Sequence, residues 1–324
     1  MSKFNKKKVF LIMMLMSTLM VMSSSKWLSI WMGMEINMMT TIPFLFKNKS
    51  KELSQKIMIY FLIQAMGSII MLTMILIKNF NWNMSLINIL MTLSMMIKLG
   101  TPPFHPWMPE MFNKMNWDIM FVMITLQKIN PLIVTSQLSE QNKILTIIMI
   151  TSATVGSISG INQLSLNKIM AFSSINHMAW MLMCMLTKNE LWMKYFIIYS
   201  IITATLCVMF HKNLIFYTNQ LNINSNNPSK IKMLLMMLNL GGLPPLPGFF
   251  LKWMTVEAMM TSGYFLIMTI MIFSSMVTLM FYMRMMYTSM MLSSMTLKFK
   301  LMDSSKYFYS MIMVNIIMPI MILI

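Results

Sequence analysis

The sequence predicts an all-α protein that crosses a membrane many times, as a single membrane domain over residues 1–324. Hydrophobic residues make up 57% of the chain and charged residues only 10%, whereas a soluble domain carries about 25% charged residues. Apolar runs of about 20 residues, the length that a spanning helix needs, also recur along the whole chain. The lipid bilayer is therefore the expected surroundings of most of its side chains.

Eleven apolar segments are expected to be spanning helices. In chain order they cover residues 9–24, 27–46, 56–77, 84–112, 117–138, 143–160, 167–187, 191–211, 231–261, 264–288 and 307–324. The first segment has a basic start that is typical of a secretory signal peptide. It is counted as a span because no clear small-x-small cleavage site follows and another apolar run begins at once.

Two of these segments, 84–112 and 231–261, are too long for simple spans, and similar sequences interrupt them. Residues 99–103 read LGTPP, and residues 240–245 read LGGLPP. Proline removes a backbone donor and clashes with the preceding turn, so each helix should open there. The expected helix breaks involve Gly100, Pro102, Pro103, Gly241, Gly242, Pro244 and Pro245.

The two interrupted segments suggest an internal repeat. Five spans in 9–138 and five in 143–288 would form two structural repeats, with 307–324 as an additional C-terminal helix. An odd number of helices in each repeat forces inverted topology, as in many ion-coupled transporters.

The net charge of +17 reflects lysines that lie mostly between apolar runs. Basic flanks are normal for spanning helices, and the side that is richer in lysine faces inwards. Alternate connections hold most of the lysines, including Lys47, Lys114 and Lys212, while the others hold few, among them Lys78 and Lys188. This asymmetry predicts an N-terminus on the lysine-rich side and a C-terminus opposite, and it favours membrane orientation over nucleic-acid binding.

Methionine is unusually frequent, with 52 residues. A genetic code that reads AUA as methionine, as in most animal mitochondria, would produce this bias from AT-rich codons. The composition therefore indicates a gene inside an animal mitochondrion. The expected location is the inner membrane, with the N-terminus in the matrix and the C-terminus in the intermembrane space.

Ionisable residues lie deep in five of the apolar runs: Glu35, Lys98, Lys128, His177 and Lys252. A Lys or Asp at mid-membrane costs roughly 2.5–3.5 kcal/mol, and four charges without partners would together cost about 10 kcal/mol. Open backbone at this depth survives only beside protein or a water-filled cavity. A glutamate–lysine pair near the first break, and a lysine near the second, can therefore load protons.

Two of these residues leave alternatives open. Lys128 could be a lysine that snorkels to the interface. His177 suits a proton relay because its ordinary pKa lies near neutrality, but a lone histidine in a helix is more often a hydrogen-bonded core residue. Cys184 and Cys207 lack CxxC spacing, and no Walker A motif or dinucleotide fingerprint is present, so no cofactor or metal is expected in this chain.

The stretches WMGMEIN, IKLGTPPFHPWMPE, LQKINP, NKIMAFSSINHMAW and GGLPPLPGFFLKW occur in this order. Together they resemble the signatures of the chain 2 family of mitochondrial NADH–ubiquinone oxidoreductase, an antiporter-like, proton-pumping subunit in the membrane arm of respiratory complex I. The resemblance runs from about residue 25 to about residue 290. The AT-rich composition suggests an insect or another arthropod.

This resemblance implies roles for the buried ionisable residues. Glu35 and Lys98 would form the pair of a first channel, Lys128 and His177 the central relay, and Lys252 the terminal lysine. It also implies eleven helices and pumping driven by quinone reduction elsewhere in the complex. NADH, FMN, iron–sulfur clusters and ubiquinone would all be bound by other subunits.

The implied partners are the other membrane-arm subunits of complex I, including its other antiporter-like subunits, and lipid such as cardiolipin. Three residues depart from the family pattern and put local geometry in doubt: Pro106, Pro247 and Leu251. Two other functions remain open. One is a stand-alone or Mrp-like cation/proton antiporter, and the other is a structural spacer whose buried charges only lock helices together.

Overall fold

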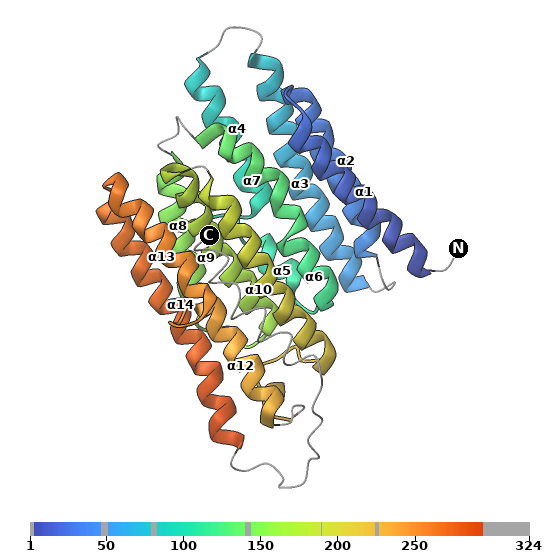
Figure 1. Cartoon of the computed structure of the whole chain (residues 1–324). Helices are drawn as coiled ribbons and strands as arrows, with labels where there is room; N and C mark the ends of the chain where they lie inside the picture. Colours follow the sequence, from blue (N-terminus) through green and yellow to red (C-terminus); the bar gives the residue numbers. More distant parts are fainter. Residues whose placement is uncertain are drawn as a thin grey trace. The chain divides into compact units, whose positions relative to one another are not determined.

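The computed structural model describes residues 3–46, 51–78, 83–139, 144–188, 190–223 and 227–293. Within these ranges the predicted all-α class is confirmed, since all regular structure is helical apart from one isolated β-bridge between Ser165 and Tyr217 (Figure 1).

The helices of the described ranges are α1 (Lys3–Ser23), α2 (Trp27–Leu45), α3 (Lys51–Ile77), α4 (Met84–Leu99), α5 (Trp107–Phe112), α6 (Trp117–Ile124), α7 (Leu126–Leu138), α8 (Ile144–Gly160), α9 (Leu166–Thr187), α10 (Leu191–Asn213), α11 (Gln220–Ile223), α12 (Asn227–Gly241), α13 (Pro247–Ser262) and α14 (Phe265–Ser293). Each predicted segment from 9–24 to 264–288 overlaps at least one of them. The last predicted segment, 307–324, lies outside the described residues.

Five described stretches are long and apolar enough to cross a membrane. They are Lys51–Ile77, Trp117–Leu138, Leu166–Thr187, Leu191–Asn213 and Phe265–Tyr287. Shorter apolar helices cover Met84–Leu99 and Ile144–Gly160. The length and hydrophobicity of these helices agree with a multi-span membrane protein.

The chain divides into two compact units. The first comprises the described parts of Met1–Met115 and Val122–Ile148, and the second those of Asn116–Phe121 and Met149–Ile324. A short piece of chain that includes the start of α6 thus belongs to the second unit, although α7 belongs to the first.

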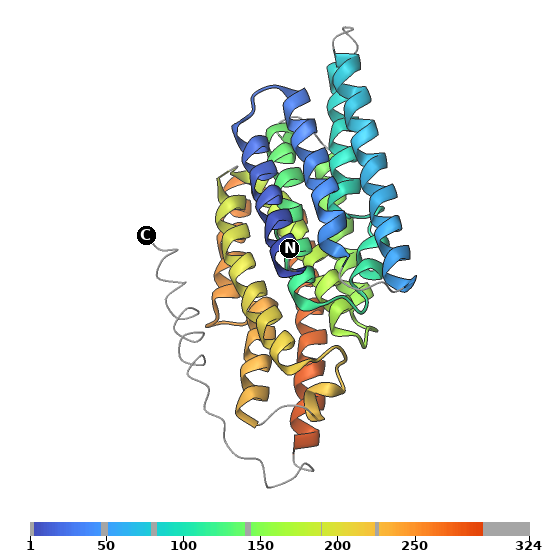
Figure 2. The same cartoon turned by 90° about the vertical axis from the view of Figure 1, so that its right-hand side faces the viewer.

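In the first unit, α1 packs on α2, α2 on α3 and α3 on α4, while α7 packs against α1, α2 and α4. Figure 2 shows α3 and α4 side by side along most of their length. Gly33 explains the close packing of α1 on α2, because a Cβ added there would lie 2.6 Å from a methyl carbon of Val21. Small residues let helices in membranes approach one another in this way.

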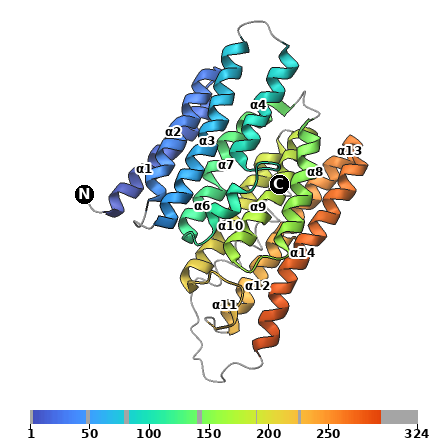
Figure 3. The same cartoon turned by 180° about the vertical axis from the view of Figure 1, so that it is seen from behind.

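In the second unit, α9 is buried along nearly its whole length. It packs against α10, α13 and α14, and α12 packs against α10, α13 and α14 (Figure 3). Gly156 brings α8 close to α9, because an added Cβ would lie 2.9 Å from the backbone nitrogen of Asn176. His177, the next residue on α9, therefore lies in the interior of this unit.

Candidate functional site

The first break follows α4 and has a defined geometry. Gly100 caps α4 with a φ of +68°, a left-handed conformation that glycine adopts without steric cost. Its N–H donates to Ile97 O at 3.3 Å, and the N–H of Thr101 donates to Met96 O at 3.2 Å. The chain is then non-helical through Pro102 and Pro103 until α5 begins.

Lys98 lies in the last turn of α4, directly before this break, and is 7% exposed. Trp107 closes the other side of the break, since a Cβ on Gly100 would lie 3.0 Å from its indole ring. The lysine is therefore enclosed at the point where the helix opens.

Glu35 lies on α2 and is half-buried. Its Oε1 atom is buried without a hydrogen-bond partner, and its carboxylate interacts electrostatically with Lys98. Among the described residues the two do not come within the 4.0 Å of a direct ion pair. They are therefore coupled charges held apart on different helices, rather than a contact pair.

Lys128 lies on α7, three residues after Thr125, where the helix is interrupted between α6 and α7. Its backbone N–H donates to Thr125 O at 3.0 Å. The residue is only 2% exposed, which disfavours the alternative of a lysine that snorkels to the surface.

His177 lies on α9 and is 6% exposed. Its Nδ1 atom is 2.8 Å from the Tyr195 hydroxyl on α10. Its ring also lies 4.7 Å, centroid to centroid, from the ring of Tyr199, which is on α10 as well. The histidine is therefore held on one side by an oriented hydrogen bond and on another by an aromatic face.

Lys252 lies on α13 and bonds across the second break. Its Nζ atom donates to Gly241 O, the last residue of α12, at 2.7 Å. Gly242 follows with a φ of +77°, and a Cβ there would lie 3.1 Å from the lysine side chain. A cation at this position also complements the partial negative charge at a helix C-terminus.

A second contact fixes the two halves of this broken segment. The N–H of Gly248, in the first turn of α13, donates to Asn239 Oδ1 on α12 at 2.8 Å. Even a methyl group would not fit at Gly248, because its Cβ would lie 1.7 Å from Asn239 O. Pro244 and Pro245 lie in the turn between the two helices, so the lysine bonds across a short and tightly packed connection.

The structure brings together part of the predicted set within each unit. In the first unit, Glu35 and Lys98 interact, and Lys128 lies on a helix that packs against both of theirs. In the second unit, His177 and Lys252 lie on α9 and α13, which pack together. Of the residues searched, no three His, Cys, Asp or Glu side chains form a group that could hold a metal ion.

Uncharged polar residues that the sequence analysis missed surround these charges in the first unit. Gln64, on α3, donates from Nε2 to Lys98 O at 3.1 Å. Gln127, next to Lys128, donates to Asn37 Oδ1 at 3.0 Å and accepts from the Tyr60 hydroxyl at 3.0 Å. The sequence did carry a signal for them, because Tyr60 and Gln64 are polar groups one helical turn apart inside an apolar segment.

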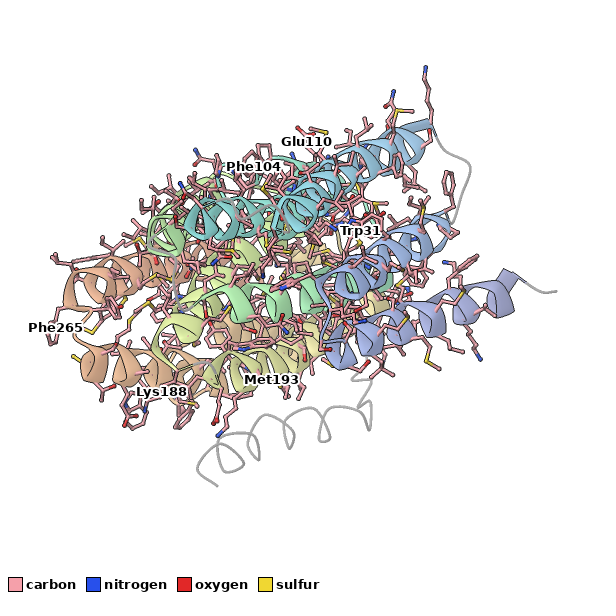
Figure 4. The ribbon with its side chains drawn as sticks, turned by 90° about the horizontal axis from the view of Figure 1, so that it is seen from above. Trp31, Phe104, Glu110, Lys188, Met193 and Phe265 are labelled. Atoms are coloured by element: carbon pink, nitrogen blue, oxygen red, sulfur yellow. The ribbon has the colours of Figure 1, made fainter. Side chains whose placement is uncertain are left out.

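The acidic residue of α5 lies apart from these charges. Glu110 is exposed, and Figure 4 shows it, with Phe104, at the outside of the helices around it. It is therefore not part of the buried set.

Comparison with known proteins agrees with this geometry. Residues 24–278 match the family described as NADH:quinone oxidoreductase/Mrp antiporter, transmembrane. Over 286 residues the chain is 40% identical to NADH-ubiquinone oxidoreductase chain 2 of Anopheles gambiae, covering 86% of this chain and 84% of that protein. The corresponding protein of Locusta migratoria is 35% identical over 285 residues, covering 86% and 83%.

The fold is also similar to that of a solved structure. A chain of respiratory complex I from Thermus thermophilus with bound aureothin superposes with a TM-score of 0.80, over 88% of this chain and 70% of that one. At 17% sequence identity this likeness establishes the fold alone.

Proposed function

The chain belongs to the NADH–ubiquinone oxidoreductase chain 2 family, and from this we propose that it carries protons across the membrane within complex I. The proposed relay consists of Glu35, Lys98, Lys128, His177 and Lys252. Electron transfer from NADH to ubiquinone elsewhere in the complex would drive it.

One observation carries this proposal: an apolar membrane protein keeps three lysines and a histidine in its interior. Lys98, Lys128, His177 and Lys252 are each at most 9% exposed. Ionisable groups in membrane-spanning segments are costly, and they usually mark ion or proton pathways. The Glu35 carboxylate, which interacts electrostatically with Lys98, adds a group of opposite charge to this set.

We further propose the finer topology. Eleven spans would form two inverted five-helix repeats, 9–138 and 143–288, followed by the C-terminal helix 307–324. The similar ends of α4 and α12, each followed by a glycine with positive φ, support a repeat. The lysine distribution supports an N-terminus in the matrix and a C-terminus in the intermembrane space.

In this assignment the chain contributes no redox chemistry of its own. NADH, FMN, the iron–sulfur clusters and ubiquinone would be bound by other subunits. Its neighbours would be other membrane-arm subunits, including other antiporter-like ones. It would lie in the mitochondrial inner membrane, where lipid such as cardiolipin would contact its lipid-facing surface. The exposed apolar side chains of α14, such as Leu266 and Phe273, suit such an environment.

A stand-alone cation/proton antiporter is the second candidate, because the matching family description includes Mrp antiporters. The identity of 40% to an insect chain 2, over most of both chains, favours the complex I assignment. The two candidates differ in what the chain assembles with.

Native electrophoresis of gently solubilised mitochondrial membranes tests this difference. We expect the chain, identified by mass spectrometry, in the large band that oxidises NADH. Detection of the chain in a small assembly without NADH activity would instead favour the stand-alone antiporter.

A variant tests the relay itself. In assembled complex, Lys98→Met should abolish most of the proton translocation that accompanies NADH oxidation by ubiquinone, because the buried proton-carrying group is lost. Lys194→Met, at an exposed position on α10, is the matched control and should pump normally. Normal pumping by Lys98→Met would remove Lys98 from the relay, and loss of assembly alone would favour the structural spacer.

A further inference from the structure

The inner face of α3 carries polar groups but no charge. Beyond its first turns, which hold Lys51, Glu52 and Lys56, the helix has no ionisable side chain except that of Tyr60. Yet α3 packs against both α2 and α4, the helices of Glu35 and Lys98. An element between two coupled charges can determine their separation.

Tyr60, Gln64 and Gly67 follow one another at spacings of four and three residues, which places them on one face of the helix. All three are buried. The opposite face is apolar and exposed, as the exposed fractions of Met58, Leu62, Met66 and Ile69, between 55% and 64%, indicate. We call Tyr60, Gln64 and Gly67 the α3 inner face.

Gln64 provides a hydrogen-bond donor for a backbone carbonyl at the C-terminal end of α4. The last carbonyls of a helix have no partner within it, and the apolar membrane interior does not supply one. Here the Met96 and Ile97 carbonyls accept from backbone N–H groups beyond the helix end. The Lys98 carbonyl accepts from the Gln64 side chain at 3.1 Å. Gln64 therefore fixes the backbone that carries the lysine.

Gly67 provides the surface on which the lysine side chain lies. A Cβ added at Gly67 would be 3.0 Å from Lys98 Cγ, 3.4 Å from Lys98 Cε and 3.1 Å from Ser94 O. The alkyl chain of the lysine is thus in van der Waals contact with the α3 backbone. Any side chain at this position would displace the lysine or separate the two helices.

Tyr60 extends the same face to the helix of Lys128. Its hydroxyl donates to Gln127 Oε1 at 3.0 Å, and Gln127 Nε2 donates to Asn37 Oδ1 at 3.0 Å. Gln127 directly precedes Lys128, and Asn37 follows Glu35 by two residues. The Thr41 hydroxyl, 3.2 Å from the Tyr60 oxygen, adds a second contact with α2.

A further hydrogen bond joins α2 to α3 close to the glutamate. Trp31, labelled in Figure 4, donates from its indole nitrogen to Ser68 O at 3.1 Å. Trp31 precedes Glu35 by one helical turn, and Ser68 follows Gly67 directly. The glutamate helix is therefore fixed against α3 at the level where α3 contacts Lys98.

We propose that the α3 inner face positions the proton relay of the first unit: Gln64 and Gly67 hold Lys98, and Tyr60 holds the segment before Lys128, at fixed separations from Glu35. These three are positioning residues. They act through the charged groups and need not carry the proton. The proposal rests on the proposed function, since it assumes that Lys98 exchanges a proton in the catalytic cycle.

The consequence is electrostatic. The interaction between a carboxylate and an ammonium group depends on their separation, so a lysine displaced from Gly67 interacts differently with Glu35. The pH profile of coupled NADH oxidation should therefore change, which a general loss of stability would not cause.

The test uses whole complex I with Gly67→Ala and Gln64→Met. The first adds the methyl group that the packing excludes, and the second keeps the side-chain length but cannot donate to Lys98 O. For each we expect normal assembly, proton translocation per NADH lowered at least about threefold, and a changed pH profile. Met66→Ala, on the exposed face of the same helix, is the matched control and should behave as the unmodified complex.

A double variant shows whether the effect passes through the lysine. Lys98→Met with Gln64→Met should translocate no fewer protons than Lys98→Met alone, because Gln64 would have nothing left to position. Additional loss in the double variant would overturn the proposal. Unchanged translocation together with an unchanged pH profile in Gln64→Met would also overturn the proposal. If Gly67→Ala does not assemble, Gln64→Met alone is the test.

The outcomes also separate this proposal from the one on which it rests. Full pumping by Lys98→Met would refute the role of the lysine, and with it the positioning of that lysine. Loss of pumping in Lys98→Met with normal Gln64→Met and Gly67→Ala complexes would refute only the role of the α3 inner face.

Discussion

His177 and Lys252 are hydrogen-bonded to neutral groups that serve both of their protonation states. The Tyr195 hydroxyl can donate to a neutral imidazole or accept from a charged one, and it lies 2.8 Å from His177 Nδ1. The Gly241 carbonyl can only accept, but a lysine has N–H groups to donate whether it is charged or neutral. Neither partner fixes the proton permanently, which suits the proposed relay, in which both residues would gain and lose a proton.

Tyr195→Phe tests this reasoning at the histidine. The substitution removes one hydroxyl and keeps the ring, so the loss is about 0.5–1.5 kcal/mol, the net value of one hydrogen bond. If that bond orients the relay histidine, coupled proton translocation should fall between about twofold and tenfold, with complex content unchanged. Tyr217→Phe, at an exposed tyrosine of the same unit, is the control. Unchanged translocation in Tyr195→Phe would show that His177 does not depend on this bond.

At the scale of the element, the broken segments place a lysine beside a helix end in two different ways. Lys98 belongs to the half-helix that precedes its break, whereas Lys252 belongs to the half that follows and reaches back to the carbonyl of Gly241. In both, a glycine with positive φ follows the first half-helix. The conformation of the break, rather than the direction from which the lysine comes, is the shared feature.

Gly100→Ala tests the requirement for glycine at the first break. A left-handed conformation costs an L-residue about 1–2 kcal/mol, and the added methyl group would also lie 3.0 Å from the Trp107 ring. Gly263→Ala is a matched control, because its φ is +78° but nothing lies within 4 Å of its Cβ position.

We expect Gly100→Ala to lower the temperature at which solubilised complex loses NADH:ubiquinone activity further than Gly263→Ala does. Equal losses would mean that Trp107 moves aside without cost, and that only the backbone conformation matters at this break.

Hydrophobicity and the positions of prolines predicted where the helices lie along the sequence, because span length and helix breaking are local properties. The interruption at Thr125 was missed, since no glycine or proline marks it and Pro131, the nearest proline, lies within α7. The partners of the charges could not be predicted either. Gln64 and Tyr195 become partners of Lys98 and His177 only because α3 packs on α4 and α10 on α9, and such pairing depends on tertiary packing.

At the scale of the whole molecule, lysines outside the apolar segments carry most of the net charge of +17. The lysine-rich connections should face the matrix, because positive charge is retained on the side from which a membrane protein inserts. The same exposed lysines can report the orientation, since an amine-reactive reagent that cannot cross the membrane modifies only one side.

Labelling of mitoplasts and of inverted inner-membrane vesicles with such a reagent, followed by mass spectrometry, therefore tests the topology. Lys188 and Lys194, both exposed, should react in mitoplasts, whose outer surface is the intermembrane-space side. Lys114 and Lys212, also exposed, should react only in inverted vesicles. Detergent-solubilised complex is the control in which all four should react, unless another subunit covers them. The opposite pattern would reverse the orientation, and reaction of Lys114 and Lys188 from the same side would contradict the proposed number of spans between them.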